Sequence, residues 1–158
     1  MRNHDITRQI NRIRELVQRV DQACGGDLEL QAHWARYVCV LTSGLIENSA
    51  RASYTDFAGR AASAPVAKHT ASVLTELRNP KTERLLTLAG RFKNEWRIEL
   101  EVFATENGRR EAVDAIMSNR HLIAHGQGHN SNLSLATVEG YFVKSVEVLE
   151  FIEGQCYR

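Results

Sequence analysis

Apolar residues recur along this chain at the three-to-four-residue spacing of an α-helix, and no other feature constrains the fold as strongly. The first apolar stripe ends before Gly25-Gly26 and consists of Ile6, Ile10, Ile13, Leu16, Val17 and Val20. A second, longer helix is predicted from about Asp27 to Arg60, and its apolar arc is wide enough for a central position. No segment alternates apolar and polar residues as a half-buried strand would, so the sequence predicts an all-α fold.

Turn-forming residues divide the rest of the chain into further helices. Asn79-Pro80 and Asn107-Gly108 each separate two predicted helices, and the last helix is expected to begin near Ser134. The length of 158 residues favours a single domain over residues 1–158. We therefore expect an up-and-down helical bundle of about five to six helices.

Charge and cysteine content argue against several classes of protein. Lys and Arg total 20 against 19 Asp and Glu, so the formal net charge is only +1, which is unlike a protein that coats polyanions. Cys24, Cys39 and Cys156 form no Cys-x-x-Cys pair, so they predict neither a zinc ribbon nor a disulfide framework and fit a reducing, cytoplasmic setting. No stretch approaches the roughly 20 apolar residues that cross a bilayer, so we expect no membrane-spanning segment.

Reactive side chains crowd one segment, Ser118–Gly126. The residues that its helix is expected to bury are Val113, Ile116, Met117, Ile123 and Ala124. Arg120 lies on the same helical row, where an arginine is costly unless it is paired or faces a wet cleft. His125 is the last residue before Gly126, a predicted C-terminal cap glycine, and unwinding at that glycine would bring the imidazole towards the guanidinium.

A guanidinium beside an imidazole suits the binding and cleavage of a phosphodiester. Arg120 can hold the non-bridging oxygens, and His125 can move protons near neutral pH. Two other interpretations stay open: both side chains can cap helix carbonyls, and His121, His125 and His129 have the i, i+4, i+8 spacing of a helical metal site. Two glycines are expected to end the helix before His129, so we predict no metal ligand set and no cofactor.

Two polar residues lie beside the apolar arc of the long helix. Glu47 and Asn48 fall at the edge of that arc, so one of them is expected to be buried. The alternative is an exposed Glu47–Arg51 ion pair four residues apart, which stabilises a helix by a few tenths of a kcal/mol. Both residues are retained as candidates for a supporting role at the site.

The segment Asn119–Gly126 resembles the Arg-x(4–6)-His motif of the HEPN superfamily, in which the motif lies near a helix end before a final helix. The helix Trp34–Arg51 and the segment Asn130–Leu133 are most similar to the RiboL-PSP-HEPN branch, and the resemblance extends over about residues 30–153. It implies a metal-independent endoribonuclease, often a toxin or an antiphage or abortive-infection effector. The alternatives are a non-catalytic HEPN module that binds RNA or a partner protein, and an isolated bundle whose histidines are structural.

By motif match, the resemblance implies that Arg120 and His125 are the catalytic pair. The residues expected to bind RNA or to support the pair are Asn119, His121, Glu47 and Asn48. The expected reaction is attack of the substrate's own 2′-OH on the adjacent phosphate, with His125 as general base or acid and Arg120 stabilising the phosphorane. The expected partners are RNA, a second copy of the chain and an antitoxin protein.

Three observations favour the homodimer. Arg120 lies on an apolar row and needs a polar exit that one small bundle does not obviously provide. The last helix is apolar on more than one face, which exceeds what packing on one side of a bundle requires. HEPN domains, which this chain resembles, commonly dimerise through the face that bears the motif. We therefore expect two Arg120/His125 sets to face one shared cleft.

Overall fold

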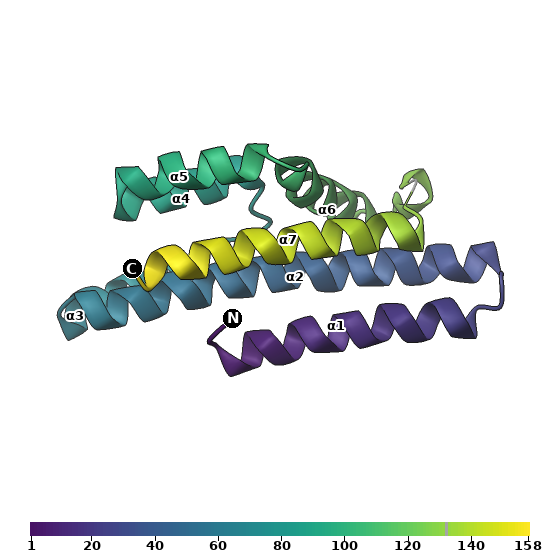
Figure 1. The fold of residues 1–158 in the computed structure, drawn as a ribbon, viewed down its shortest axis with the longest axis horizontal. Helices are drawn as coiled ribbons and strands as arrows, with labels where there is room; N and C mark the ends of the chain where they lie inside the picture. The colour runs from purple at the N-terminus through teal and green to yellow at the C-terminus, as the bar shows by residue number, and fades with distance from the viewer. Residues whose placement is uncertain (132) are drawn as a thin grey trace.

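The computed structural model describes residues 1–131 and 133–158 and contains, in those ranges, seven α-helices, one short 3₁₀ helix and no strand (Figure 1). In chain order the elements are α1 (His4–Ala23), α2 (Leu28–Ala61), α3 (Ala64–Leu74), α4 (Thr82–Phe92), α5 (Asn94–Thr105), α6 (Arg109–Ala124), η1 (Gly128–Asn130) and α7 (Leu135–Cys156). The predicted all-α bundle is confirmed, with more helices than the expected five to six.

The additional helix arises at Lys93, where the chain reverses between α4 and α5. Lys93 has extended backbone angles (φ −149°, ψ 131°) and caps both helices. The reversal brings Trp96 into an aromatic cluster, in which the ring centroids of Phe57 and Trp96 lie 4.9 Å apart and those of Tyr54 and Phe92 lie 4.7 Å apart. The sequence left open whether one helix continues here, because neither glycine nor proline stands at this position.

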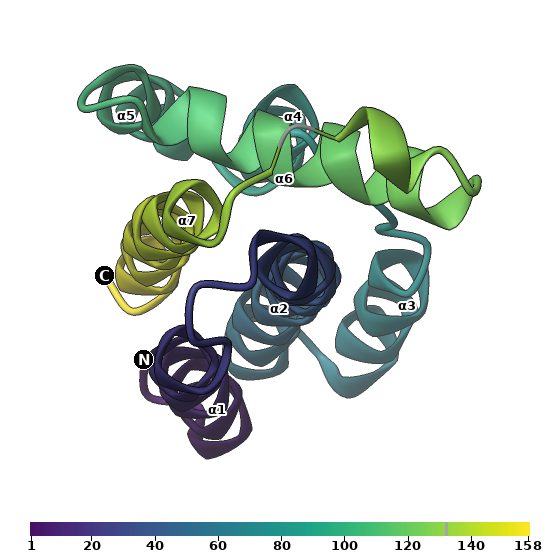
Figure 2. The same cartoon turned by 90° about the vertical axis from the view of Figure 1, so that its right-hand side faces the viewer.

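The long helix α2 is the central element, as predicted from its wide apolar arc. Viewed end-on, α1 lies on one side of α2 and α6 on the opposite side, with α7 and α3 flanking it (Figure 2). Asp27 caps the start of α2, since its carboxylate accepts a hydrogen bond from the backbone N–H of Leu30 at 3.0 Å. Leu45 and Ile46 of α2 are fully buried in the core.

The final helix, α7, is covered on several sides by the same chain. It packs against α1, α2, α5 and α6, and its residues Val138, Phe142, Leu149 and Ile152 are buried. This packing corrects one sequence-based expectation. Apart from Val143, which is 49% exposed, the large apolar residues of the last helix are wholly or partly buried in the bundle, so they provide no argument for a dimer partner.

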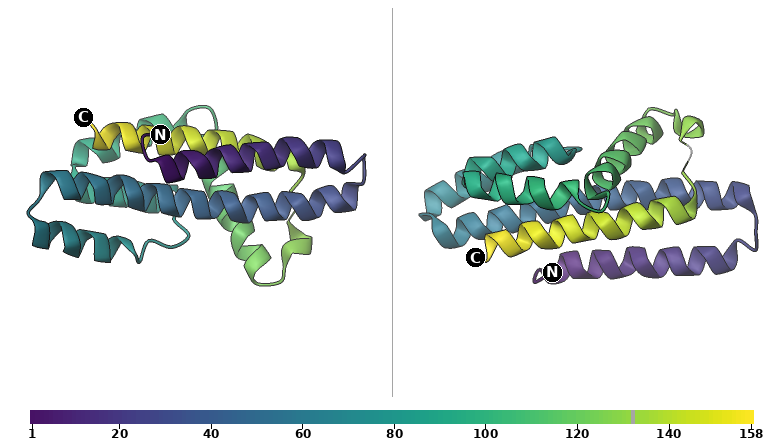
Figure 3. Two further views of the ribbon diagram at one scale, coloured as in Figure 1. Left: turned by 90° about the horizontal axis from the view of Figure 1, so that it is seen from below. Right: turned by 45° about the horizontal axis from the view of Figure 1, so that its top comes forward.

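The first helix, α1, runs alongside α2 (Figure 3, left) and is attached along a single apolar stripe. The stripe is buried, and its residues are Ile6, Ile10, Ile13, Val17 and Val20. A groove of about 680 Å³ separates the remaining surface of α1 from α2, and another of about 340 Å³ separates it from α7. Among the described residues, no helix is long and apolar enough to cross a membrane.

Candidate active site

The helix that bears the Arg-His motif, α6, leaves the direction of the long helices. It crosses α2 and α7 obliquely, and its C-terminal end projects from the bundle (Figure 3, right). Val113, Ile116 and Met117 are buried as expected. Ile123 is only half-buried and Ala124 is exposed, contrary to expectation, because the last turn of α6 extends beyond the core.

The chain ends α6 with the cap that its sequence predicts. His125 is the capping residue, and Gly126 follows with a left-handed φ of 72°, a conformation that glycine adopts without a steric penalty. The N–H of Gln127 donates to the carbonyl of Leu122 at 2.9 Å, and the N–H of Gly126 donates to the carbonyl of Ile123 at 3.2 Å. These two bonds form a Schellman motif, which fixes the backbone of His125 at the helix end.

Arg120 lies at the border between core and solvent. It is half-buried, and its side chain makes no hydrogen bond or ion pair to any described residue. Beneath it, the thiol of Cys39 on α2 donates to the carbonyl of Ile116 at 3.5 Å. Burial raises the pKa of Cys39 to about 12, while the backbone N–H of Arg120 opposes that rise. The contact holds α6 against α2 just before the motif.

The two histidines of the motif lie together on the exposed end of α6. The ring centroids of His121 and His125 are 4.4 Å apart, with the planes tilted by 58°. The imidazole of His125 therefore lies beside His121 and makes no hydrogen bond with Arg120. Within the described residues, neither Arg120 nor His125 caps a helix carbonyl with its side chain, so the capping interpretation finds no support.

The remaining predicted residues have local partners. The side chain of Asn119 donates to the carbonyl of Ala115 at 2.9 Å, within its own helix. Glu47 is half-buried; it pairs with Arg51 at 3.5 Å and accepts the backbone N–H of Asn79. Both the expected ion pair and the expected burial are thus found in part, and Glu47 serves the connection between α3 and α4.

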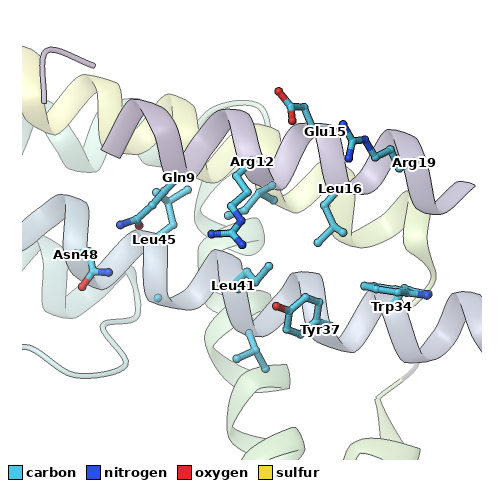
Figure 4. Close-up of a pocket in the computed structure, with 13 residues that line it drawn as sticks. Gln9, Arg12, Glu15, Leu16, Arg19, Trp34, Tyr37, Leu41, Leu45 and Asn48 are labelled. Carbon is cyan, nitrogen blue, oxygen red and sulfur yellow. The ribbon is translucent and has the colours of Figure 1, made fainter. Parts of the chain in front are cut away.

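Asn48 occupies a different surface from the motif. It is exposed and lines the groove between α1 and α2, on the side of α2 that faces α1 (Figure 4). Neither Glu47 nor Asn48 makes a hydrogen bond or ion pair with Arg120 or His125 in the described part of the chain. The structure therefore brings His121 to the motif histidine and leaves these two residues of α2 in other contacts.

Arg36 was not predicted as a site residue, but it extends from α2 to the turn that follows the motif. Its Cδ would lie only 3.4 Å from a Cβ built on Gly128, so its stem packs directly under that backbone. Its Nε is buried and finds no hydrogen-bond partner among the described residues, and one terminal nitrogen lies 3.4 Å from Nδ1 of His33. The i, i+3 pair of His33 and Arg36 was the available sequence signal, but nothing in the sequence linked it to Gly128.

The helix that would carry His121, His125 and His129 on one face ends before His129, as the two glycines predicted. α6 ends at Ala124, and His129 belongs to the separate 3₁₀ turn η1. In residues 1–131 and 133–158, no three His, Cys, Asp or Glu side chains form a group able to hold a metal ion. Asn132, which belongs to the segment that resembles the RiboL-PSP-HEPN branch, lies outside the described residues.

Comparison with known proteins agrees with the resemblance noted in the sequence. The sequence model of the RiboL-PSP-HEPN family matches residues 4–158, nearly the whole chain. The chain has no significant match among curated proteins or among solved structures. The helical architecture and the position of the Arg-His motif before the final helix agree with this assignment. The chain therefore belongs to the RiboL-PSP-HEPN family, whose domains are of the ribonuclease type.

Proposed function

We propose that this protein is a metal-independent endoribonuclease whose catalytic pair is Arg120 and His125. The observation that carries the proposal is the end of α6, which presents an exposed imidazole five residues after a half-buried guanidinium. No described carboxylate forms an ion pair with Arg120, so its charge is available to a phosphate. The helix cap at Gly126 fixes the backbone from which His125 acts.

The proposed reaction uses only groups of the RNA and of this chain. His125 accepts the proton of the ribose 2′-OH, the 2′-oxygen bonds to phosphorus, and the bond from phosphorus to the 5′-oxygen breaks. Arg120 stabilises the charge that develops on the non-bridging oxygens. A protonated histidine then supplies the proton to the leaving 5′-oxygen. The products are a 2′,3′-cyclic phosphate and a 5′-hydroxyl, and DNA is excluded because it lacks the nucleophile.

Further residues of the site have proposed supporting roles. His121 contacts the ring of His125 and is placed to orient it or to relay a proton. Arg36 offers a second guanidinium beside the turn that follows the motif, which suits a neighbouring phosphate of the bound strand. Asn119, whose amide is bonded within α6, supports the helix rather than the substrate.

The proposed biological role is that of a toxin or an antiphage or abortive-infection effector acting on cytoplasmic RNA. An antitoxin protein would then restrain the activity. The active form is proposed to be a homodimer in which two motifs face one cleft, since a single motif offers one Arg120 and one His125 while the reaction needs both a base and an acid. Family membership supports the ribonuclease class.

The test is cleavage of a mixed RNA substrate by purified protein. His125→Ala is expected to lower the cleavage rate by about 10²–10⁴-fold with an unchanged circular dichroism spectrum, because it removes the proton-transfer group. The matched control is His69→Ala, which changes an exposed histidine on α3. Wild-type cleavage is expected to persist in EDTA and to leave cyclic phosphate ends.

Three outcomes would overturn the proposal. Wild-type cleavage by a folded His125→Ala protein would show that the residue is not catalytic. Loss of cleavage in chelator, restored by zinc or magnesium, would favour a metal site. Binding of RNA by the wild-type protein without any cleavage would favour the non-catalytic HEPN module.

A further inference from the structure

A groove lies between α1 and α2, away from the motif. Figure 4 shows Arg12 and Leu16 projecting from α1 towards α2, where Trp34 and Tyr37 line the groove. The groove has a volume of about 680 Å³. It lies on the side of α2 opposite α6, so a ligand here leaves the Arg-His motif open (Figures 2 and 4).

The walls of the groove have the dimensions of a helix-binding site. Its lining residues on α2 run from Trp34 to Asn48, which is about 21 Å at a rise of about 1.5 Å per residue. Its lining residues on α1 run from Gln9 to Arg19, or about 15 Å. Two helices that pack side by side leave a groove that a third helix can fill. The groove between α1 and α2 is long enough for about four turns of such a helix.

The floor of this groove is apolar and partly open to water. Tyr37 is 50% exposed and Val40 is 39% exposed, while Trp34 and Leu41 are half-buried. At Gly44, on the α2 wall, no atom of the described residues outside the adjoining α2 backbone lies within 4 Å of the place a Cβ would occupy, so a partner backbone can approach closely there. A contiguous exposed apolar surface of this kind is characteristic of protein–protein contacts.

The rim of the groove is positively charged. Arg12 and Arg19 stand seven residues apart on α1, about 10 Å along the helix axis, and neither forms a hydrogen bond or ion pair with a described residue. Among the described residues that line the groove, Glu15 is the one acidic side chain. An incoming helix with carboxylates two turns apart would complement this pair of guanidinium groups.

We propose that the α1–α2 groove is the docking site for an amphipathic helix of another protein, about four turns long, whose apolar stripe is flanked by Asp or Glu. Aliphatic residues such as Leu16, Leu41 and Leu45 dominate the floor, which suits knobs from a helix better than the bases of an RNA strand. The inference does not depend on the ribonuclease proposal, since the groove and the motif use opposite sides of α2.

The experiment selects binders from a displayed library of helix-forming peptides of about 18 residues on the wild-type protein, with counter-selection on Val40→Glu. Val40 is exposed, so its replacement should leave the fold intact while placing a charge in the groove. The recovered peptides are expected to share an apolar stripe with acidic flanks. Their affinity should fall at least about tenfold on Val40→Glu and on the double variant Arg12→Glu/Arg19→Glu.

The matched control is Ile98→Glu, because Ile98 is 54% exposed on α5, outside the groove. This variant should bind the peptides like the wild type. Recovery of basic peptides would overturn the proposal. So would a selection in which every recovered peptide binds Val40→Glu as tightly as Ile98→Glu. Loss of binding to a 2′-O-methyl RNA strand in Val40→Glu would instead identify RNA as the occupant of the groove and overturn the proposal. A wild-type dimer, detected by light scattering, that dissociates in Val40→Glu would identify a second copy of the chain and overturn it as well. RNA cleavage is measured separately and should be unchanged in Val40→Glu.

Discussion

Two side chains one helical turn apart on α2 connect the central helix to the motif. Cys39 is buried under α6, and because its pKa is raised to about 12 by burial, the thiol stays neutral and donates to the carbonyl of Ile116. Arg36 lies one turn earlier, under the turn that follows the motif. Cys39 therefore has a structural role, whereas Arg36 carries a charge that the described residues do not neutralise.

Arg36→Ala is expected to weaken RNA binding about tenfold and to reduce the slope of log affinity against log salt by about one, since one phosphate contact is lost. The measurement is fluorescence anisotropy with a 2′-O-methyl RNA at several salt concentrations. The control is Arg14→Ala, which removes an exposed arginine of α1 that bonds to Asn11. An equal effect of both changes would mean that net charge alone matters and that Arg36 has no specific contact.

Residue-level prediction succeeded where the information is local. His125 and Gly126 are adjacent in the sequence, so the capping rule predicted the end of α6 correctly. Glu47 was harder, because its partner is the backbone N–H of Asn79, which reaches it only through the packing of α3 and α4. Arg36 was missed for the same reason: tertiary packing brings it to Gly128, and a glycine has no side chain that could indicate a partner.

At the scale of the element, the termination of α6 determines where the motif histidine, His125, lies. Gly126 adopts a φ of 72°, which a residue with a Cβ enters only at a cost. The lysine that separates α4 from α5 shows the opposite case, in which the chain breaks a helix without glycine or proline. Helix ends that glycine or proline marks were predictable from the sequence. The break at Lys93 was not, because the tertiary burial of Trp96 determines it.

Gly126→Ala is expected to cost about 1 kcal/mol of stability, a fall in Tm of roughly 2–4 °C, and to reduce RNA cleavage because the backbone of His125 shifts. Thermal unfolding and cleavage assays measure the two effects. Gly140→Ala is the matched control, because Gly140 is exposed within α7 and no described atom outside the adjoining α7 backbone lies within 4 Å of the place a Cβ would occupy. Alanine there should stabilise the protein by about 0.5–1 kcal/mol. Stabilisation by both changes would contradict the proposed role of the cap.

At the scale of the whole molecule, the homodimer proposal now rests on the motif alone. Most of the apolar residues of the long α7 are covered by α1, α2, α5 and α6, so surplus hydrophobic surface no longer argues for a partner. Sequence periodicity predicted correctly that this helix is apolar on several faces. It could not show that neighbours from the same chain cover them, since that depends on how the helices are arranged.

If each site combines Arg120 of one subunit with His125 of the other, mixing inactive Arg120→Ala and His125→Ala proteins should restore activity. One composite site per heterodimer is then intact, so an equilibrated equal mixture should recover up to about a quarter of wild-type cleavage. Light scattering reports the oligomeric state alongside. A fully active monomer would rule out the shared cleft, and an inactive mixture of proven heterodimers would place both residues of a site in one subunit.

The attachment of α1 by one buried stripe has a kinetic consequence. With a groove on either side and a link through Gly25 and Gly26, whose φ values are 52° and 91°, α1 is expected to open locally while the remaining helices stay packed. Its amide hydrogens should therefore exchange with deuterium through local opening, at a lower free energy than those of the enclosed α2. Mass spectrometry of exchange would show α1 labelled first, and a helix seated between α1 and α2 would slow that labelling.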